Sequence, residues 1–180
     1  MNQRFISRAT WLGAACLASC ASAPQPAVPS AEPAAPHELL APFAKLVGGT
    51  WTAAFNAEIY DEQSFSWVFG GRFLRNRHQV RTTKDGQIVY EGETIYAVDP
   101  TTNQLVWWYW NATGGHIVGT ARWEDEVCLF EGDNHGAPGQ TQRVRSTLAF
   151  DADGWTSSIW YLAADGSWQL RNTRAYRRAR

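Results

Sequence analysis

A histidine and several carboxylates on neighbouring expected strands are the side chains best suited to chemistry in this sequence. His78 lies two residues after Asn76, and Glu91 and Glu93 follow on the next expected strand. An imidazole beside a carboxylate can take up and release protons near neutral pH, so these residues are candidates for an acid–base pair. Exposed carboxylates, or a hydrogen-bonded network that includes Arg171, would give the same pattern without catalysis.

Aromatic side chains are the second kind of candidate site. The sequence holds 10 tryptophans, and the densest run is Trp107–Trp110, which reads Trp-Trp-Tyr-Trp. Alternate residues of a strand point to opposite faces, so one pair of this run faces the interior. We expect Trp107 and Tyr109, together with Trp67 and His78, to line a cavity for an apolar ligand. The alternative is that the same aromatic pair simply fills a packed core.

Metal and cofactor chemistry find little support in the sequence. No two of the four histidines have the close spacing of a metal-binding pair on a strand or helix. The sequence also lacks a nucleophile elbow, a phosphate-binding loop and a cysteine–histidine signature. We therefore expect neither a metal ion nor a cofactor.

The elements that must position these side chains are mostly short strands. Segments rich in aromatic and β-branched residues alternate with turn residues such as Asp153-Gly154 and Asp165-Gly166, which are strong hairpin signals. The expected strands are Thr50–Ile59, Gln63–Phe69, Arg72–Thr83, Gln87–Val98, Gln104–Asn111, His116–Trp123, Val127–Gly132, Gln142–Phe150, Trp155–Leu162 and Ser167–Tyr176.

This pattern predicts an all-β fold. About ten antiparallel strands with short connections favour an up-and-down barrel, because closure removes the exposed edges; a β-sandwich is the main alternative. Apolar residues at helical spacing predict one short helix over Glu38–Val47, before the first strand. The segment Asn134–Gly139 is expected to be the longest connection, at an open rim of the barrel.

The N-terminal segment is of the secretory type. Arg4 and Arg8 precede an apolar run of about ten residues, too short for a bilayer span of roughly 20 residues. Leu17-Ala18-Ser19-Cys20 then resembles the lipobox of bacterial lipoproteins. The resemblance implies cleavage before Cys20, lipidation of that cysteine and, because Ala21 follows it, the outer membrane. Ordinary secretion with a free Cys20 thiol is the alternative.

Composition divides the chain into a signal peptide at residues 1–19, a lipidated cysteine with a Pro/Ala-rich tether at 20–37, and one domain at 38–180. Without the signal peptide, 14 basic residues remain against 17 acidic ones, a balance that argues against nucleic acid as a partner. Cys128 would then be the last free thiol, and its strand-like surroundings predict a buried apolar role.

An ordered series of motifs resembles a known family. Leu46-Val47-Gly48-Gly49-Thr50-Trp51 is similar to the Gly-x-Trp entry of lipocalin-like (calycin) barrels, where Trp51 would close one end of the barrel. With the motifs that follow, the chain resembles the bacterial domain-of-unknown-function family numbered 1579. The resemblance implies a calycin barrel, and it transfers no catalytic residues because none are established for the family. Haem-binding calycins carry a late histidine that this chain lacks. The supporting motifs are Gly70–Leu74, Tyr90–Gly92, Tyr96–Asp99, Trp107, Gly119, Glu131–Gly132, Asp165–Trp168 and Tyr176–Arg178.

Together these observations predict a lipoprotein of the cell envelope, anchored to the membrane through Cys20 and facing the periplasm. Its barrel is expected to bind a small, largely apolar ligand. Two alternatives stay open. The first is a module that docks an envelope protein through its surface. The second is an isomerase or hydrolase that uses His78 with Glu91 or Glu93.

Overall fold

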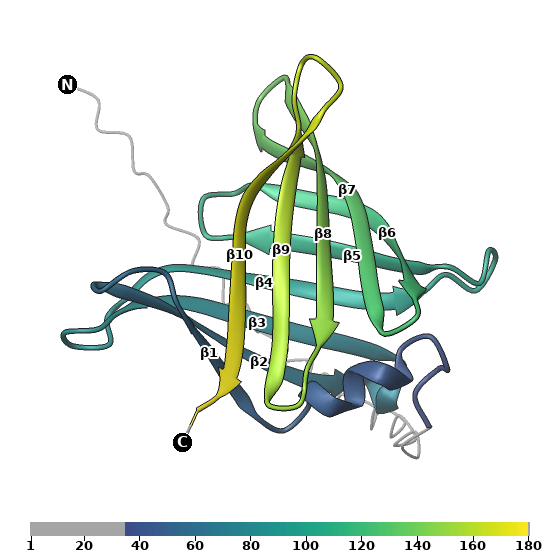
Figure 1. The fold of residues 1–180 in the computed structure, drawn as a ribbon. Coiled ribbons are helices and arrows are strands. Elements are labelled where there is room, and N and C mark those ends of the chain that lie inside the picture. Colours follow the sequence, from purple (N-terminus) through teal and green to yellow (C-terminus); the bar gives the residue numbers. More distant parts are fainter. Residues whose placement is uncertain (1–34, 180) are drawn as a thin grey trace, which may run out of the picture. The chain divides into compact units, whose positions relative to one another are not determined.

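Ten antiparallel strands close into a barrel in the computed structural model, which describes residues 35–179 (Figure 1). Two short 3-10 helices, η1 and η2, accompany the strands. The elements are η1 (Ala41–Leu46), β1 (Thr50–Ala54), β2 (Ile59–Val68), η2 (Phe69–Gly71), β3 (Phe73–Thr82), β4 (Ile88–Val98), β5 (Leu105–Asn111), β6 (His116–Glu124), β7 (Val127–Ala137), β8 (Gln140–Phe150), β9 (Gly154–Leu162) and β10 (Trp168–Arg178).

The strand order follows the chain. Each strand pairs with its sequence neighbour, and β1 pairs with β10, so the sheet has no free edge. The closing contact is short: it joins Trp51 with Arg178 and Thr52 with Arg177. This confirms the predicted all-β, up-and-down barrel and excludes the sandwich.

Two details of the prediction are wrong. The expected helix over Glu38–Val47 is a 3-10 helix of six residues, η1, preceded by a turn. The expected long connection Asn134–Gly139 is a tight hairpin, because β7 continues through a bulge to Ala137 and Gly139 takes a positive φ of 72° in the turn.

The structure does not test the prediction for the N-terminal segment. Residues 1–34, which include the expected signal peptide, Cys20 and most of the tether, lie outside the described residues. Among residues 35–179, no helix has the length and apolar character needed to cross a bilayer.

The helix η1 covers one end of the barrel (Figure 1). Phe43 is fully buried, with its ring centroid 5.1 Å from that of Trp123 and 5.4 Å from that of Tyr96. The Trp123 indole donates a hydrogen bond of 2.8 Å to the Leu39 carbonyl, and the Trp51 indole donates one of 2.9 Å to the Leu46 carbonyl. Both indoles therefore bind the backbone that flanks or ends η1.

Cys128 lies fully buried within the barrel core as a free thiol. Burial raises the pKa of this thiol far above its ordinary value, which disfavours the reactive thiolate. The prediction of a buried apolar role is confirmed.

The Trp107 side chain lies over glycines of the two strands that follow its own, β6 and β7. In the register of the sheet, Trp107 stands opposite Gly119, which stands opposite Gly132. A Cβ at Gly119 would lie 2.7 Å from the Trp107 Nε1 and 2.0 Å from the Glu131 carbonyl oxygen. The indole instead fills that space and donates to the Thr120 carbonyl at 3.1 Å.

We expect Gly119→Ala to destabilise the barrel, because the added methyl group overlaps backbone and forces Trp107 to move. Overpacking of this kind costs about 1–3 kcal/mol. Urea unfolding followed by tryptophan fluorescence measures the change. Gly136→Ala is the matched control, since its Cβ would meet only Asn134 Oδ1, at 3.9 Å. Equal stability of the two variants would contradict this account of the packing.

Candidate functional site

The barrel encloses a cavity of about 340 Å³, within the range of small-molecule sites. Near η1 its wall is apolar: Tyr96, Trp107 and Phe130 lie here, with ring centroids 5.7–5.8 Å apart across their contacts. Tyr96 and Phe130 also contact Phe43 of η1, so this is the covered end. Further apolar lining comes from Phe65, Ile117, Val144, Leu148, Trp155 and Ile159.

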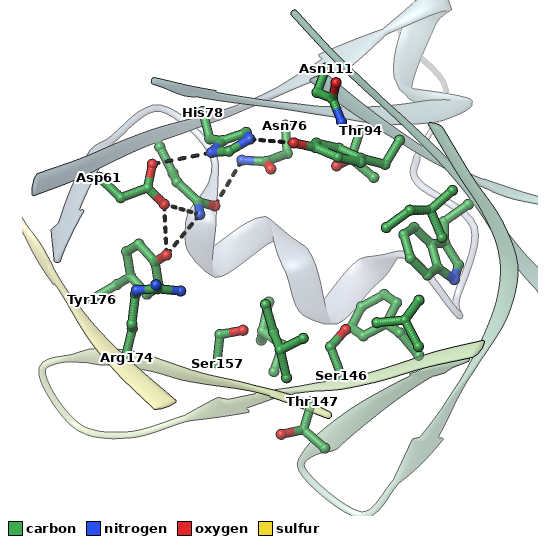
Figure 2. A pocket seen from close by; sticks show the side chains of 18 of the residues that line it. Asp61, Asn76, His78, Thr94, Asn111, Ser146, Thr147, Ser157, Arg174 and Tyr176 are labelled. Carbon is green, nitrogen blue, oxygen red and sulfur yellow. Dashed lines mark hydrogen bonds and ion pairs between the residues drawn. The ribbon is translucent and has the colours of Figure 1, made fainter. Parts of the chain in front are cut away.

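Away from η1, one wall of the cavity is polar. It is built by inward-facing residues of β2, β3, β4, β5 and β10, and its centre is Asp61 with His78 (Figure 2). Asp61 is only 2 % exposed. Its Oδ1 lies 3.2 Å from Nδ1 of His78. A buried carboxylate thus contacts one ring nitrogen of the imidazole.

Two tyrosine hydroxyls continue the contact on the other side of His78. The Nε2 atom lies 3.0 Å from the Tyr109 hydroxyl, which lies 2.7 Å from the Tyr90 hydroxyl. Asp61, His78, Tyr109 and Tyr90 therefore form one continuous row of hydrogen bonds, and all four line the cavity. We call this set the polar row.

The second oxygen of Asp61 is also satisfied. Its Oδ2 accepts hydrogen bonds from the Tyr176 hydroxyl at 2.7 Å and from the Gln63 amide at 2.8 Å. The Gln63 carbonyl accepts from Asn76 at 3.2 Å, which orients the amide so that its NH₂ faces the carboxylate. Such donors replace the hydrogen bonds to water that a buried carboxylate loses.

Gly92 makes room for the polar row. In the sheet register, Gly92 stands opposite both His78 and Asn111. A Cβ at this position would lie 2.6 Å from the Tyr109 hydroxyl oxygen and 2.7 Å from His78 Nε2. The contact between the His78 imidazole and the Tyr109 hydroxyl thus requires a glycine at position 92.

Burial controls the protonation of the tyrosines around the cavity. Burial, and then the neighbouring Tyr90 hydroxyl and the charge of Asp61, raises the pKa of Tyr109 far above its ordinary value. Burial followed by Asp61 does the same to the pKa of Tyr176, and burial raises that of Tyr96. These hydroxyls are therefore neutral hydrogen-bonding groups and not anions.

Arg174 brings a cation to the cavity lining beside Tyr176 (Figure 2). Its guanidinium carbon lies 3.7 Å from the centroid of the Phe55 ring, and its Nη1 donates to the Asn172 amide oxygen at 2.7 Å. The side chain is thus held by contacts within the protein.

The structure brings together three of the four expected ligand-binding residues. His78, Trp107 and Tyr109 line the cavity, whereas Trp110, on the opposite face of β5, is exposed. Trp67 lies elsewhere: it packs against the hydrophobic core and is not part of the cavity lining.

The expected carboxylate partner of His78 is wrong. Glu91 and Glu93 face outward, where Glu91 accepts from Gln79 and Glu93 lies 3.8 Å from Arg77. The partner in the structure is Asp61, which falls in the gap at residues 60–62 between two expected strands. Residues 60–62 lie inside β2, where Asp61 alternates in phase with Phe65.

The described histidines do not form a metal site with other side chains. Within residues 35–179, no cluster of three or more histidine, cysteine or acidic side chains is close enough to hold a metal ion. His116 and His135 stand opposite each other on β6 and β7, with ring centroids 4.7 Å apart. This pairing across strands is invisible in the sequence spacing.

Known structures include a similar fold. The crystal structure of Rv2717c from M. tuberculosis matches with a TM-score of 0.57 and 18 % sequence identity, covering 81 % of this chain and 99 % of that chain. At this identity the likeness establishes the fold alone, a ten-stranded antiparallel β-barrel. No protein-family model matches the chain, and no curated protein matches it.

The raised pKa values predict a loss of stability in alkali. Tyrosines of the unfolded chain ionise as the pH passes their ordinary pKa of 10.0, whereas Tyr96, Tyr109 and Tyr176 stay neutral in the folded barrel. The unfolded state then binds fewer protons, so the free energy of unfolding falls as the pH rises above about 10. Urea unfolding midpoints at a series of pH values, with tyrosinate absorbance recorded alongside, measure this. Full tyrosine ionisation in a barrel that is still folded would contradict it.

Proposed function

We propose that the barrel binds a small, largely apolar ligand in its cavity. The observation that carries the proposal is the arrangement of the cavity wall: aromatic side chains surround the end covered by η1, and the polar row lies toward the other end. An apolar body can occupy the first region while a single polar group meets the second. Because the polar groups are already held by hydrogen bonds, a ligand need not order them on binding.

The cavity favours this function over a surface interaction module. A module that acts only through its exterior needs no internal space, and a barrel of this size can be filled by its own side chains. Here about 340 Å³ is left open beside Tyr90, Tyr109 and Arg174. That space supports ligand binding as the first choice.

The Asp61–His78 contact favours a second candidate, proton-transfer catalysis. A carboxylate that holds one ring nitrogen fixes the tautomer of the imidazole, as an acid–base catalyst requires. An isomerase or hydrolase of small molecules would use His78 with Asp61, in place of the glutamates expected from the sequence.

We further propose that the protein is an envelope lipoprotein, anchored through Cys20 in the outer membrane and facing the periplasm. The support is the lipobox-like string Leu17–Cys20 and the Pro/Ala-rich residues after it. Membership of the domain-of-unknown-function family numbered 1579 belongs to the same proposal and is supported by the ordered motifs of the barrel. An envelope protein partner is compatible with this location.

Filling the cavity tests ligand binding. Ser157 lines the cavity, so we expect Ser157→Phe to weaken binding of the apolar fluorescent probe N-phenyl-1-naphthylamine at least tenfold. The probe's emission rises in apolar surroundings, and titration of the purified protein gives the affinity. Ser158→Phe is the matched control, because Ser158 lies on the outer face of the same strand and contacts the Thr173 hydroxyl at 2.8 Å. Equal affinities of both variants and the wild type would exclude the cavity as the site.

Removing the acceptor for lipidation tests the anchor. We expect Cys20→Ala to abolish incorporation of radiolabelled palmitate and to release the protein from the membrane fraction, since one acyl-bearing cysteine is the proposed attachment. Cell fractionation with immunoblotting measures the distribution. Cys128→Ala is the control, because that thiol is buried in the barrel. Membrane association that survives Cys20→Ala would contradict the proposal.

A further inference from the structure

We infer that the cavity selects apolar ligands that carry a hydrogen-bond donor, such as a hydroxyl group, because the polar row ends on an acceptor, the Tyr90 hydroxyl oxygen. This inference rests on the proposed ligand binding and names the class of ligand. It follows from counting the protons along the row, beginning at Asp61.

The direction of the row is set at the carboxylate. A carboxylate can only accept hydrogen bonds, and the Oδ2 atom of Asp61 already takes those of Tyr176 and Gln63. The remaining oxygen, Oδ1, faces Nδ1 of His78 at 3.2 Å. Two acceptors at this distance would repel each other, so Nδ1 carries the imidazole proton.

The position of the proton on Nδ1 fixes the donor and acceptor of each further hydrogen bond in the row. A neutral imidazole with its proton on Nδ1 has an acceptor at Nε2, which takes the hydroxyl proton of Tyr109. Since Tyr109 has no second proton, the 2.7 Å contact between the two tyrosines requires Tyr90 to donate. Both hydroxyl protons are then used.

What remains at the cavity is an oxygen lone pair. Within residues 35–179, the Tyr90 hydroxyl has no side-chain hydrogen bond besides that to Tyr109. A ligand hydroxyl placed against it can donate. An ether or carbonyl oxygen at the same point would meet another acceptor and lose its hydrogen bonds to water, which weakens binding.

Arg174 favours a different class of ligand from the polar row. Its guanidinium lines the cavity and would favour an anionic ligand, but it already lies over Phe55 and donates to Asn172. The polar row carries the charge of Asp61 on the same wall, which disfavours a second carboxylate nearby. An acid of the same shape is therefore an informative third probe.

Three probes with one aromatic body test the inference: 2-naphthol, which donates; 2-methoxynaphthalene, which only accepts; and 2-naphthoate, which is an anion. Titration calorimetry on the purified protein near neutral pH gives the affinities. We expect 2-naphthol to bind at least tenfold more tightly than the other two. Equal affinity of the naphthol and its methyl ether, or tighter binding of the acid, would overturn the inference.

The row predicts that one isosteric change abolishes the preference. In Asp61→Asn, the amide oxygen can still accept from Tyr176 and Gln63, which leaves the amide NH₂ to donate to Nδ1 of His78. The imidazole proton then moves to Nε2, and every donor in the row turns round. Tyr90 would donate into the cavity, where an ether oxygen and a hydroxyl oxygen can both accept, so 2-methoxynaphthalene should gain affinity and the preference for 2-naphthol should be lost.

The tautomer of His78 is measurable without any ligand. Nitrogen-15 NMR, assigned with His78→Gln, should show the proton on Nδ1 in the wild type and on Nε2 in Asp61→Asn. An Nε2–H tautomer or a fully protonated ring in the wild type near neutral pH would overturn the inference.

A second variant covers the case in which Asp61→Asn does not fold. Tyr109→Phe removes the partner of Tyr90, whose freed hydroxyl can then donate as well as accept, so the preference for 2-naphthol should shrink. Tyr161→Phe, which changes another tyrosine of the lining, is the control and should keep the preference. Failure of every probe to bind would contradict the proposed function itself, whereas binding without preference contradicts only the donor selectivity.

Discussion

The pairing of β1 with β10 is the contact on which the rest of the molecule depends. It joins the two ends of the barrel sequence through the pairs Trp51–Arg178 and Thr52–Arg177, and without it the sheet would be open and have no interior. Neighbouring contacts reinforce it. The Trp51 indole binds the Leu46 carbonyl, and the Ala179 amide donates to the Thr50 carbonyl at 2.8 Å. Closure and the covering of one end by η1 are thus coupled through Trp51.

Closure also makes the buried carboxylate of Asp61 possible. Removing a carboxylate from water costs several kcal/mol unless donors replace the lost hydration. Those donors come from β2, β3 and β10, and Tyr176 of β10 reaches Asp61 of β2 only because β1 and β10 are paired. The polar row is therefore a product of the closed barrel. Its groups are hydrogen-bonded to one another, so they stay fixed and give the cavity a defined hydrogen-bonding pattern.

The two halves of the cavity suit the two parts of an amphipathic molecule. Trp107 provides an aromatic surface for which the glycines at 119 and 132 leave room, and Gly92 leaves room for the contact between His78 and Tyr109. Glycines on the strands thus make room for the side chains of both regions. The result is a cavity in which apolar contacts supply binding energy and a few polar groups decide which ligands fit.

Much of the fold was readable in the sequence. Alternating aromatic and β-branched residues with Asp-Gly turns predicted ten strands and an up-and-down barrel, because strand periodicity and hairpin signals are local properties. The same alternation placed Trp107 and Tyr109 on one face of their strand. The strand-like run around Cys128 predicted that this residue is buried, and the structure confirms it.

The partners of these residues were decided by the tertiary structure alone. A sequence does not say which residue of the next strand stands opposite His78, and a shift of one residue exchanges the inward and outward faces. The register turned Glu91 and Glu93 to the exterior and brought Asp61, which lies between two of the expected strands, to the imidazole. Likewise Tyr176 meets Asp61 across 115 residues of chain, a contact that exists only because the sheet closes.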